Sequence, residues 1–408
     1  MRLWFIATVE DLLFYIQCKK NTGESFYLVH LNLLTYLAAV WLRVGSGSLV
    51  FRRGPTSGAR ALPDFDVDET RISTCFNVLA GRLYQEDARH AYVATLGLIQ
   101  KLNSKSLITK FVIPSGRHIH HLAATDFAKK NEISRLYINY GNFPGRTFFD
   151  PLGTDAESSV YVNGIHPPES FTEREAKLII RNALSEKSNQ SSIPQKTTYF
   201  KEIVKSLAFR FSVVAESWLG ICGDRRIISL PERGPVFFAD IVEKEALERL
   251  PPFFFFPLQV SSDVQVVRNY DGGSIENSIK QALAYTKKKG KILVVKLHPA
   301  EKDQQTVIRL LDLLKKTASL KTANLPTDIL IKYAEKVVTI NSTVGLEAKL
   351  LDREVHFMGK SMYADMDARQ MAWYLRTILI KVDYHSGKGS AEDFCRVKEL
   401  LQNESSLY

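Results

Sequence analysis

The sequence contains few cysteines and no long hydrophobic run, and both shortages narrow the class of protein. None of the four cysteines forms a CxxC pair: they are Cys18, Cys75, Cys222 and Cys395. Such isolated cysteines predict neither a disulfide framework nor a zinc site, and they fit a reducing cytoplasm. The apolar stretch at residues 26–42 includes polar residues and is shorter than the roughly 20 residues of a membrane span. We therefore interpret it as a buried strand and helix.

Three further signals are missing. The first half of the chain has no GxGxxG fingerprint, which argues against a dinucleotide-dependent enzyme. Glu10 and Asp11 interrupt the apolar N-terminus too early for a signal peptide. Lysines and arginines are scattered rather than gathered in a basic tail, so no nucleic-acid partner is predicted. The net charge of +10 nevertheless favours an anionic partner, such as a phosphorylated substrate or an anionic membrane face.

Apolar segments of strand length alternate with helical patterns along the chain. The clearest segments are residues 2–8, 25–31, 108–114, 135–140, 234–241, 251–260 and 291–299. Alternation of this kind predicts open parallel sheets with right-handed crossovers. Because both halves of the chain show it, we predict an α/β fold with two Rossmann-like domains that face each other across a cleft.

Domain boundaries follow from composition. Residues 185–195, SEKSNQSSIPQ, have the composition of a linker, and a hydrophobic helix is expected over residues 199–219. We predict an N-terminal domain over residues 1–230 and a C-terminal domain over residues 231–375. Residues 376–408 are expected to form a helical segment that can pack back on the N-terminal domain.

One strand end in the second half carries a histidine. His298 and Pro299 end the apolar run ILVVKLHP. A histidine at the carboxyl end of a strand can donate a hydrogen bond to a phosphate, and proline stops the strand. An ordinary loop histidine remains the alternative.

A second strand end leads into a small polar turn, in the stretch VVTINSTVGLEA. Ser342 and Thr343 lie at the predicted start of a helix, where hydroxyl groups and free backbone N–H groups attract anions. Gly345 is expected to let a ligand approach closely. A capping box closed by Glu347 explains the same residues without a ligand, so both interpretations stay open.

Carboxylates and amides follow two other predicted strands. Asp263 comes just after the strand in FFFFPLQVSSD, and it is either a site residue or a solvated loop carboxylate. In the first half, the turn-rich stretch YINYGNFPGRTFFDPLG contains Asn139 and Asp150 directly after a buried strand. Such an insertion is a candidate binding loop.

Taken in this order, the motifs NYGNFPG, FPLQ, HP and NSTVGLEA resemble those of the bacterial capsule polysaccharide synthesis and export family. Its characterised members include retaining β-Kdo glycosyltransferases (Kdo is 3-deoxy-manno-octulosonic acid). The matching motifs lie between Tyr137 and Tyr363, over half of the chain. The HP motif alone is not specific, since bacterial sialyltransferases also combine it with a serine-rich turn.

The resemblance implies a GT-B-like fold whose C-terminal domain holds the donor, CMP-β-Kdo. His298, Ser342 and Thr343 then contact the CMP phosphate, and Glu347 either reaches the ribose or caps the helix. Asp263 matches the acidic position after the PLQ strand, where a nucleophile serves double displacement. The implied donor-binding set is Gln259, His298, Pro299, Asn341, Ser342, Thr343, Gly345 and Glu347.

One departure from the family pattern concerns the acid/base. Members often carry Glu-Asn-Gly where this chain has Asn139, Tyr140 and Gly141. An asparagine cannot take a proton at neutral pH. Either another carboxylate serves, with Asp150 and Asp155 near in sequence, or the chain is a divergent, slow or inactive member.

The resulting hypothesis is a retaining transferase that moves β-Kdo from CMP-β-Kdo to a lipid-linked glycan during capsule or O-antigen synthesis. It works in the cytoplasm, with peripheral contact at the anionic inner membrane, and needs no cofactor and no metal. The DxD pattern in residues 64–69 is interpreted as a solvated loop, and the histidines of GRHIHH lack partners at metal spacing. Alternatives are another CMP-sugar transferase of sialyl type, a non-catalytic glycan-binding or assembly protein, and a sugar epimerase that uses UDP-sugars.

Overall fold

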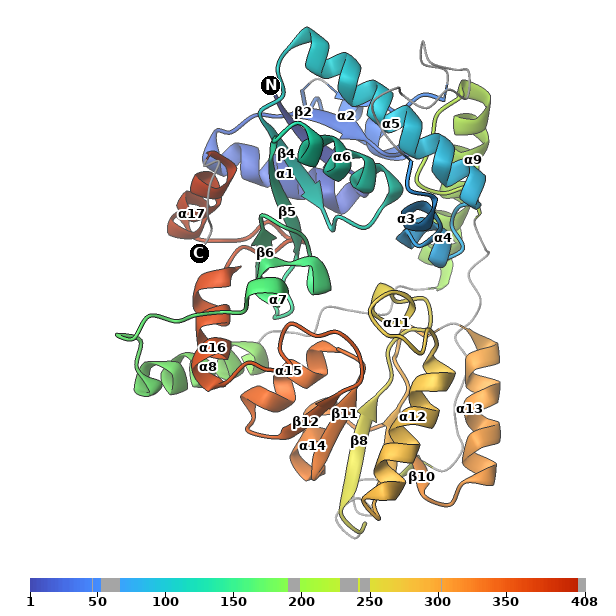
Figure 1. The fold of residues 1–408 in the computed structure, drawn as a ribbon, viewed down its shortest axis with the longest axis vertical. Helices are drawn as coiled ribbons and strands as arrows, with labels where there is room; N and C mark the ends of the chain where they lie inside the picture. The colour runs from blue at the N-terminus through green and yellow to red at the C-terminus, as the bar shows by residue number, and fades with distance from the viewer. Residues whose placement is uncertain are drawn as a thin grey trace. The chain divides into compact units, whose positions relative to one another are not determined.

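The protein is seen in a computed structural model, which describes residues 1–45, 47–52, 67–189, 199–227, 241–242, 250–301 and 303–402. The chain divides into two compact units. Unit 1 comprises Met1–Gly164, Phe200–Leu230 and Arg376–Tyr408, and unit 2 comprises Ile165–Tyr199 and Pro231–Leu375. Each unit has its own sheet and its own core (Figure 1).

Unit 1 is built on a seven-stranded sheet with the order β13-β6-β5-β4-β1-β2-β3. The strands from β5 to β3 in this order pair in parallel, while β6 pairs antiparallel with β5 and with β13. The strands are β1 (Arg2–Ile6), β2 (Tyr27–His30), β3 (Gly47–Leu49), β4 (Lys110–Pro114), β5 (Ser134–Tyr140), β6 (Thr147–Asp150) and β13 (Leu379–Ile380).

Helices cover both faces of this sheet because its apolar side chains alternate between the faces. Along β1, Leu3 and Phe5 belong to one buried cluster, whereas Trp4 and Ile6 belong to the other. The helices of unit 1 are α1 (Val9–Thr22), α2 (Leu33–Trp41), α3 (Glu69–Ser73), α4 (Phe76–Leu79), α5 (Gln85–Lys105), α6 (Ile119–Lys130), α7 (Ser159–Asn163), α9 (Tyr199–Leu219) and α17 (Ala391–Gln402), with a 3₁₀ turn at Asp155–Glu157.

Unit 2 contains a six-stranded sheet with the order β12-β11-β8-β9-β10-β7, in which every pairing is parallel. The strands are β7 (Ile241–Val242), β8 (Phe253–Pro257), β9 (Ile292–Lys296), β10 (Leu320–Ala323), β11 (Lys336–Thr339) and β12 (Glu354–Phe357). The four phenylalanines of β8 are all buried, alternating between two core clusters, as expected for a strand covered on both faces.

Helices flank the sheet of unit 2 between its strands (Figure 1). They are α8 (Glu173–Asn189), α11 (Val264–Val267), α12 (Ile275–Lys288), α13 (Gln304–Lys316), α14 (Thr327–Tyr333), α15 (Thr343–Leu350) and α16 (Ala368–Trp373), followed by a π turn at Tyr374–Ile378. The predicted α/β class with two Rossmann-like domains is confirmed. Their arrangement across a cleft stays a prediction.

The chain crosses between the units more often than its sequence suggests. Residues 376–408 lie in unit 1, where β13 extends the sheet beside β6 and α17 packs on α1. Residues 165–199, assigned above to the N-terminal domain, lie instead in unit 2, because α8 packs against α16. The boundary at residue 230, and nearly all of the strand predicted at 234–241, lie outside the described residues.

Two sequence interpretations need correction. The predicted linker at 185–195 is in part helix, since α8 continues to Asn189, and its remainder lies outside the described residues. Residues 26–42 form β2 and α2 as predicted. Three of the four β2 residues are buried, but α2 exposes Leu37, Val40 and Trp41. Within the part of the chain that the structure describes, no helix combines the length and the hydropathy of a membrane span.

We predict that Tyr384→Phe destabilises unit 1. The Tyr384 hydroxyl donates to the buried carboxylate of Asp11, which also forms a capping box with Thr8 at the start of α1. A buried acceptor that loses its donor costs about 1–3 kcal/mol in the free energy of unfolding. Urea unfolding followed by circular dichroism measures the loss.

Tyr140→Phe is the matched control, because the Tyr140 side chain is 55% exposed and its hydroxyl can bond to water. Equal stability of the two variants would contradict a structural role for the bond between Tyr384 and Asp11.

Candidate donor-binding site

The predicted binding residues of unit 2 gather at one edge of its sheet. Strands β11, β8 and β9 are neighbours and run parallel, so their carboxyl ends meet. Gln259 follows β8, His298 follows β9, and Asn341 follows β11. Ligands of open parallel sheets bind at such an edge.

The side-chain amides of Gln259 and Asn341 form hydrogen bonds that connect the loops at this edge. The Gln259 Nε2 atom donates to Asn341 Oδ1 at 3.3 Å. Asn341 in turn donates through Nδ2 to the side chain of Gln265 at 2.7 Å and to the Lys360 carbonyl at 2.9 Å. The Oε1 atom of Gln259 is buried and has no hydrogen-bond partner among the described residues. An unpaired buried acceptor is costly, so this atom is suited to receive a ligand donor.

His298 presents one ring N–H at the same edge. Its Nδ1 atom accepts a hydrogen bond from the backbone N–H of Ala300 at 3.1 Å, so the neutral ring carries its proton on Nε2. Burial lowers the pKa of the imidazole, and the negative charges of Asp263 and Glu301 oppose that shift. A neutral imidazole of this kind can donate its Nε2–H to a phosphate.

Glu301 was not identified from the sequence, although it follows His298 by three residues. It is 4% exposed and accepts from the Ser261 backbone N–H at 2.7 Å, the Ser261 hydroxyl at 3.1 Å and the Asp303 N–H at 2.8 Å. It therefore ties the loop after β8 to the loop after β9. The motif HPAE contained the signal, but the partner loop lies about 40 residues away.

The Asp263 carboxylate caps a helix and also interacts electrostatically with His298. Its Oδ1 atom accepts the Gln265 backbone N–H at 3.0 Å, which caps the short helix α11. Its negative charge also opposes the lowering of the His298 pKa by burial. Asp263 is half-buried. Its carboxylate is therefore neither fully solvated, as the alternative of a loop carboxylate would have it, nor fully buried in the core.

The N-terminus of α15 lies at the end of β11. Ser342 is its N-cap and accepts the Val344 N–H at 3.2 Å, while the exposed Thr343 begins the helix. Oriented N–H groups and the helix dipole at this end favour an anion.

Gly345 was expected to allow close approach of a ligand, which stays a prediction, and the structure gives a second reason for the glycine. A Cβ atom on Gly345 would lie 2.6 Å from Cε1 of Phe357, so the glycine is needed for packing of α15 against β12. Glu347 cannot close a capping box, because the third residue of the helix is Gly345. Its carboxylate instead pairs with Lys187 of α8 at 2.5 Å.

The two candidates of unit 1 lie on the hairpin of β5 and β6. Asn139 is 8% exposed and lies opposite Phe148. Asp150 accepts from the Ser159 hydroxyl at 2.6 Å, the Ser159 N–H at 2.9 Å and the Leu152 N–H at 2.8 Å. Burial raises its pKa, and these hydrogen bonds oppose the shift. The carboxylate thus holds its own loop, which gives it a structural role whatever its part in catalysis.

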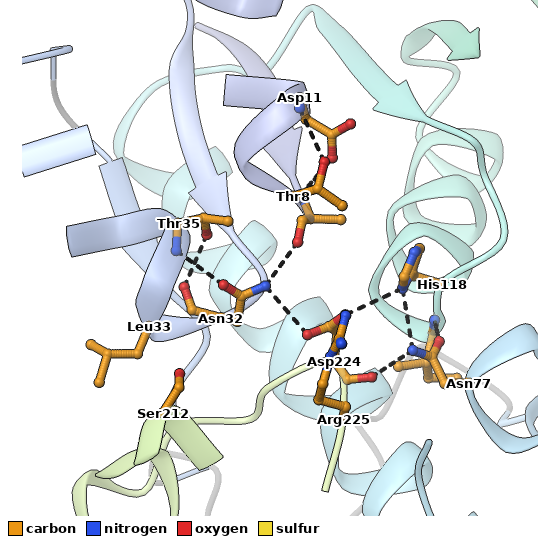
Figure 2. Close-up of polar contacts among 12 residues, drawn as sticks. Thr8, Asp11, Asn32, Leu33, Thr35, Asn77, His118, Ser212, Asp224 and Arg225 are labelled. Atoms are coloured by element: carbon orange, nitrogen blue, oxygen red, sulfur yellow. Dashed lines mark hydrogen bonds and ion pairs between the residues drawn. The ribbon is translucent and has the colours of Figure 1, made fainter. Parts of the chain in front are cut away.

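A buried polar cluster at the carboxyl edge of the unit 1 sheet was also missed (Figure 2). Asp224 is fully buried and accepts from Asn32 Nδ2 at 3.3 Å, while its carbonyl accepts from Asn77 Nδ2 at 2.7 Å. Arg225 lies 3.3 Å from the same carboxylate, and His118 lies 3.8 Å away. These residues come from four separate segments, so no local pattern in the sequence indicates them.

The histidines of GRHIHH belong to this buried region and are uncharged. Burial holds the pKa of His118 well below its usual range, and the charge of Arg82 adds to the effect. Burial likewise lowers the pKa of His120, whose Nε2 atom lies 2.9 Å from the Cys222 carbonyl. Asp68, from the DxD region, caps α3, while Asp64 and Asp66 lie outside the described residues.

Unit 2 is thus a Rossmann-like domain whose strand ends form a polar, anion-compatible edge. A sequence model described as capsule polysaccharide biosynthesis protein matches residues 237–366. The capsule polysaccharide export protein KpsS of Escherichia coli is 26% identical over 136 residues, which cover 30% of this chain and 35% of KpsS. The match therefore spans well under half of the curated relative.

Solved structures resemble the chain only loosely. The β-Kdo 2,7 transferase KpsC of Thermosulfurimonas dismutans has a TM-score of 0.41 at 12% identity, over 93% of this chain and 100% of that one. The UDP-GlcNAc 2-epimerase of Methanocaldococcus jannaschii has a TM-score of 0.34 at 14% identity, over 98% of this chain and 99% of that one. At such values the likenesses carry no argument about chemistry.

The effect of the Asp263 charge can be tested by measuring the pKa of His298. We predict that Asp263→Asn lowers the pKa of His298 further, because a carboxylate that stabilises the imidazolium is removed. Asparagine is also a good N-cap, so α11 should persist. Proton NMR titration of the His298 ring measures the shift. Asp263→Glu, which keeps the charge, is the control, and an unchanged pKa in the asparagine variant would show that the carboxylate does not face the ring.

Proposed function

We propose that the chain is a glycosyltransferase of surface-polysaccharide synthesis that takes β-Kdo from CMP-β-Kdo and transfers it to a lipid-linked glycan with retention. The family match of residues 237–366 supports the biosynthetic setting. The observation that carries the donor proposal is that His298 and the α15 N-terminus follow β9 and β11, the two strands that flank β8 in one parallel sheet.

The edge suits a donor with one phosphate. His298 offers its Nε2–H, and the first backbone N–H groups of α15 offer further donors, so the phosphate gains hydrogen bonds without a bound cation. Gln259, whose buried Oε1 has no hydrogen-bond partner among the described residues, is the candidate to accept a hydrogen bond from the nucleotide. A leaving group with one phosphate carries less charge than a diphosphate, which is why we propose no metal and no cofactor.

The proposed chemistry is a double displacement. The Asp263 carboxylate attacks the anomeric carbon of Kdo, the bond to the CMP phosphate oxygen breaks, and CMP leaves with the bonding electrons. An acceptor hydroxyl then attacks the same carbon, loses its proton to a base, and releases Asp263. Two inversions give net retention. The base is not Asn139 itself, since an amide cannot take a proton at neutral pH, and Asp150 is the candidate on the same hairpin.

A second candidate function is a non-catalytic glycan-binding member of the family. It is favoured by Asn139 at the position of the family's usual glutamate and by the hydrogen bonds that already occupy Asp150. A CMP-sugar transferase of sialyl type would use the same nucleotide edge with a different sugar pocket. Turnover assays with CMP-Kdo and CMP-sialic acid in parallel separate the three.

Nucleotide binding is the first test. We predict that the purified chain binds CMP in preference to UDP in calorimetric titration. His298→Ala should weaken CMP binding roughly 10- to 100-fold, because a hydrogen bond to a charged group contributes about 1.5–3 kcal/mol.

The matched control is His166→Ala, which alters the exposed histidine of the second HP motif and should leave CMP binding unchanged. A preference for UDP would argue for the epimerase, and an absence of any nucleotide binding would argue for the non-catalytic alternative.

Asp263→Asn should separate chemistry from binding. Transfer from CMP-Kdo should fall by at least roughly a thousandfold, because the nucleophile is lost, while CMP affinity stays near that of the parent chain. Asp271→Asn, which removes an exposed carboxylate of the same unit, is the control for charge. Equal loss of CMP binding in the Asp263 variant would make this residue a binding or structural group.

A further inference from the structure

Helix α9 of unit 1 is amphipathic with its apolar side turned outward. Leu207, Phe211, Val214 and Trp218 are 44%, 76%, 62% and 92% exposed. Their spacing of four, three and four residues places them in one stripe along the helix. A continuous stripe of this kind is unusual on a free protein surface.

The polar residues on the opposite side of α9 explain why the apolar stripe faces outward. Ser212 and Glu216 are buried, and the Ser212 hydroxyl donates to Glu216 Oε1 at 2.9 Å. The same oxygen accepts the backbone N–H of Leu33 at 2.8 Å, which joins α9 to the first turn of α2. Figure 2 shows Leu33 and Ser212 beside the buried cluster of Asp224. Because the polar side is fixed inward, the apolar stripe must face away from unit 1.

A second apolar stripe lies on α2. Leu37, Val40 and Trp41 are 52%, 59% and 82% exposed, at positions one helical turn apart. Besides the bond to Leu33, the segment after β3 binds the end of α9, since the Arg52 N–H donates to the Gly220 carbonyl. We name the two stripes together the α2–α9 surface: Leu37, Val40, Trp41, Leu207, Phe211, Val214 and Trp218.

The exposed charged side chains that these two segments contribute are all basic. Among the described residues 31–52 and 206–223, the exposed charged side chains are those of Arg43, Arg52 and Arg210. The single acidic residue in these segments is Glu216, which is buried. An apolar surface bordered by arginines is complementary to the headgroups and upper acyl chains of an anionic bilayer.

We propose that the α2–α9 surface docks the protein on an anionic lipid membrane. Trp41, Phe211 and Trp218 enter the interfacial layer, where aromatic rings are favoured, and the arginines lie against lipid phosphates. The proposed contact lies in the interfacial layer of the membrane and involves no membrane-spanning segment. It rests on exposure and charge within unit 1, so it holds whichever sugar nucleotide unit 2 binds.

A second copy of the chain is the rival occupant, and the charges disfavour it. In a twofold dimer the same surface would face itself, which brings the arginines of each copy toward those of the other. A bilayer containing anionic lipid neutralises the arginines instead.

The tryptophans allow a direct test with the full-length chain. Of its four tryptophans, Trp41 and Trp218 are the strongly exposed ones, and Trp4 is 1% exposed. We expect a blue shift of emission and co-sedimentation with vesicles of phosphatidylcholine and phosphatidylglycerol, and much weaker binding to phosphatidylcholine alone. Trp41→Ser with Trp218→Ser should reduce vesicle binding at least about tenfold. Each of Arg43→Glu and Arg210→Glu should reduce it roughly fivefold or more.

Tyr84→Ser is the matched control, because Tyr84 is 66% exposed yet lies outside the α2–α9 surface. All altered side chains are exposed, and an unchanged melting temperature verifies that each variant folds. The proposal is overturned if the parent chain does not bind anionic vesicles, or if the double tryptophan variant binds as well as the parent. A concentration-dependent dimer that the double variant abolishes, without vesicle binding, would assign the surface to a second copy.

Discussion

Parallel pairing of the strands is the constraint on which the rest of this structure depends. A parallel sheet brings the carboxyl ends of its strands to one edge, whatever the distance between them along the chain. In unit 2 this collects Gln259, His298 and Ser342 from loops separated by some forty residues each. In unit 1 the same geometry collects Asn32 and His118 around the buried Asp224. Both polar edges are therefore consequences of topology.

Both edges keep buried polar atoms without a hydrogen-bond partner among the described residues, and in unit 1 these include both ring nitrogens of His121 and the Nε atom of Arg225. In unit 1, the buried carboxylates Asp224 and Glu216 are held by side-chain amides, an arginine and a backbone N–H. In unit 2, His298 keeps a ring N–H and Gln259 keeps a buried oxygen without a partner among the described residues. Because groups without a partner gain most from being bound, these two groups make the unit 2 edge a candidate for the proposed donor.

The sequence predicted the features that are local. The run ILVVKLHP gave β9 and its histidine, and the NST turn gave the N-cap of α15, because strand length and cap chemistry are short-range signals. It did not predict Glu301, whose partner Ser261 lies on another loop, nor the packing of Gly345 against Phe357. It assigned α8 to the wrong unit, since the helix is placed by contacts with α16 some 200 residues later.

Helix α9 shows the same limit at the surface. Its apolar pattern predicted a helix, and a helix is what forms, but periodicity alone does not say which side is buried. That choice is made by Glu216, through a bond to a backbone N–H that is 183 residues away in sequence. Four apolar residues of α9 therefore face outward, against the usual burial of apolar side chains. Their exposure follows from the fold and could not be predicted from composition.

The central claim is that the carboxyl edge of the unit 2 sheet holds the phosphate of a CMP-linked sugar. A crystal structure of the protein with CMP tests it most directly. The account predicts the phosphate within hydrogen-bond distance of His298 Nε2 and of the first backbone N–H groups of α15, with Gln259 on the nucleotide. Density for CMP at any other place, or its phosphate turned away from both His298 and α15, would contradict the account.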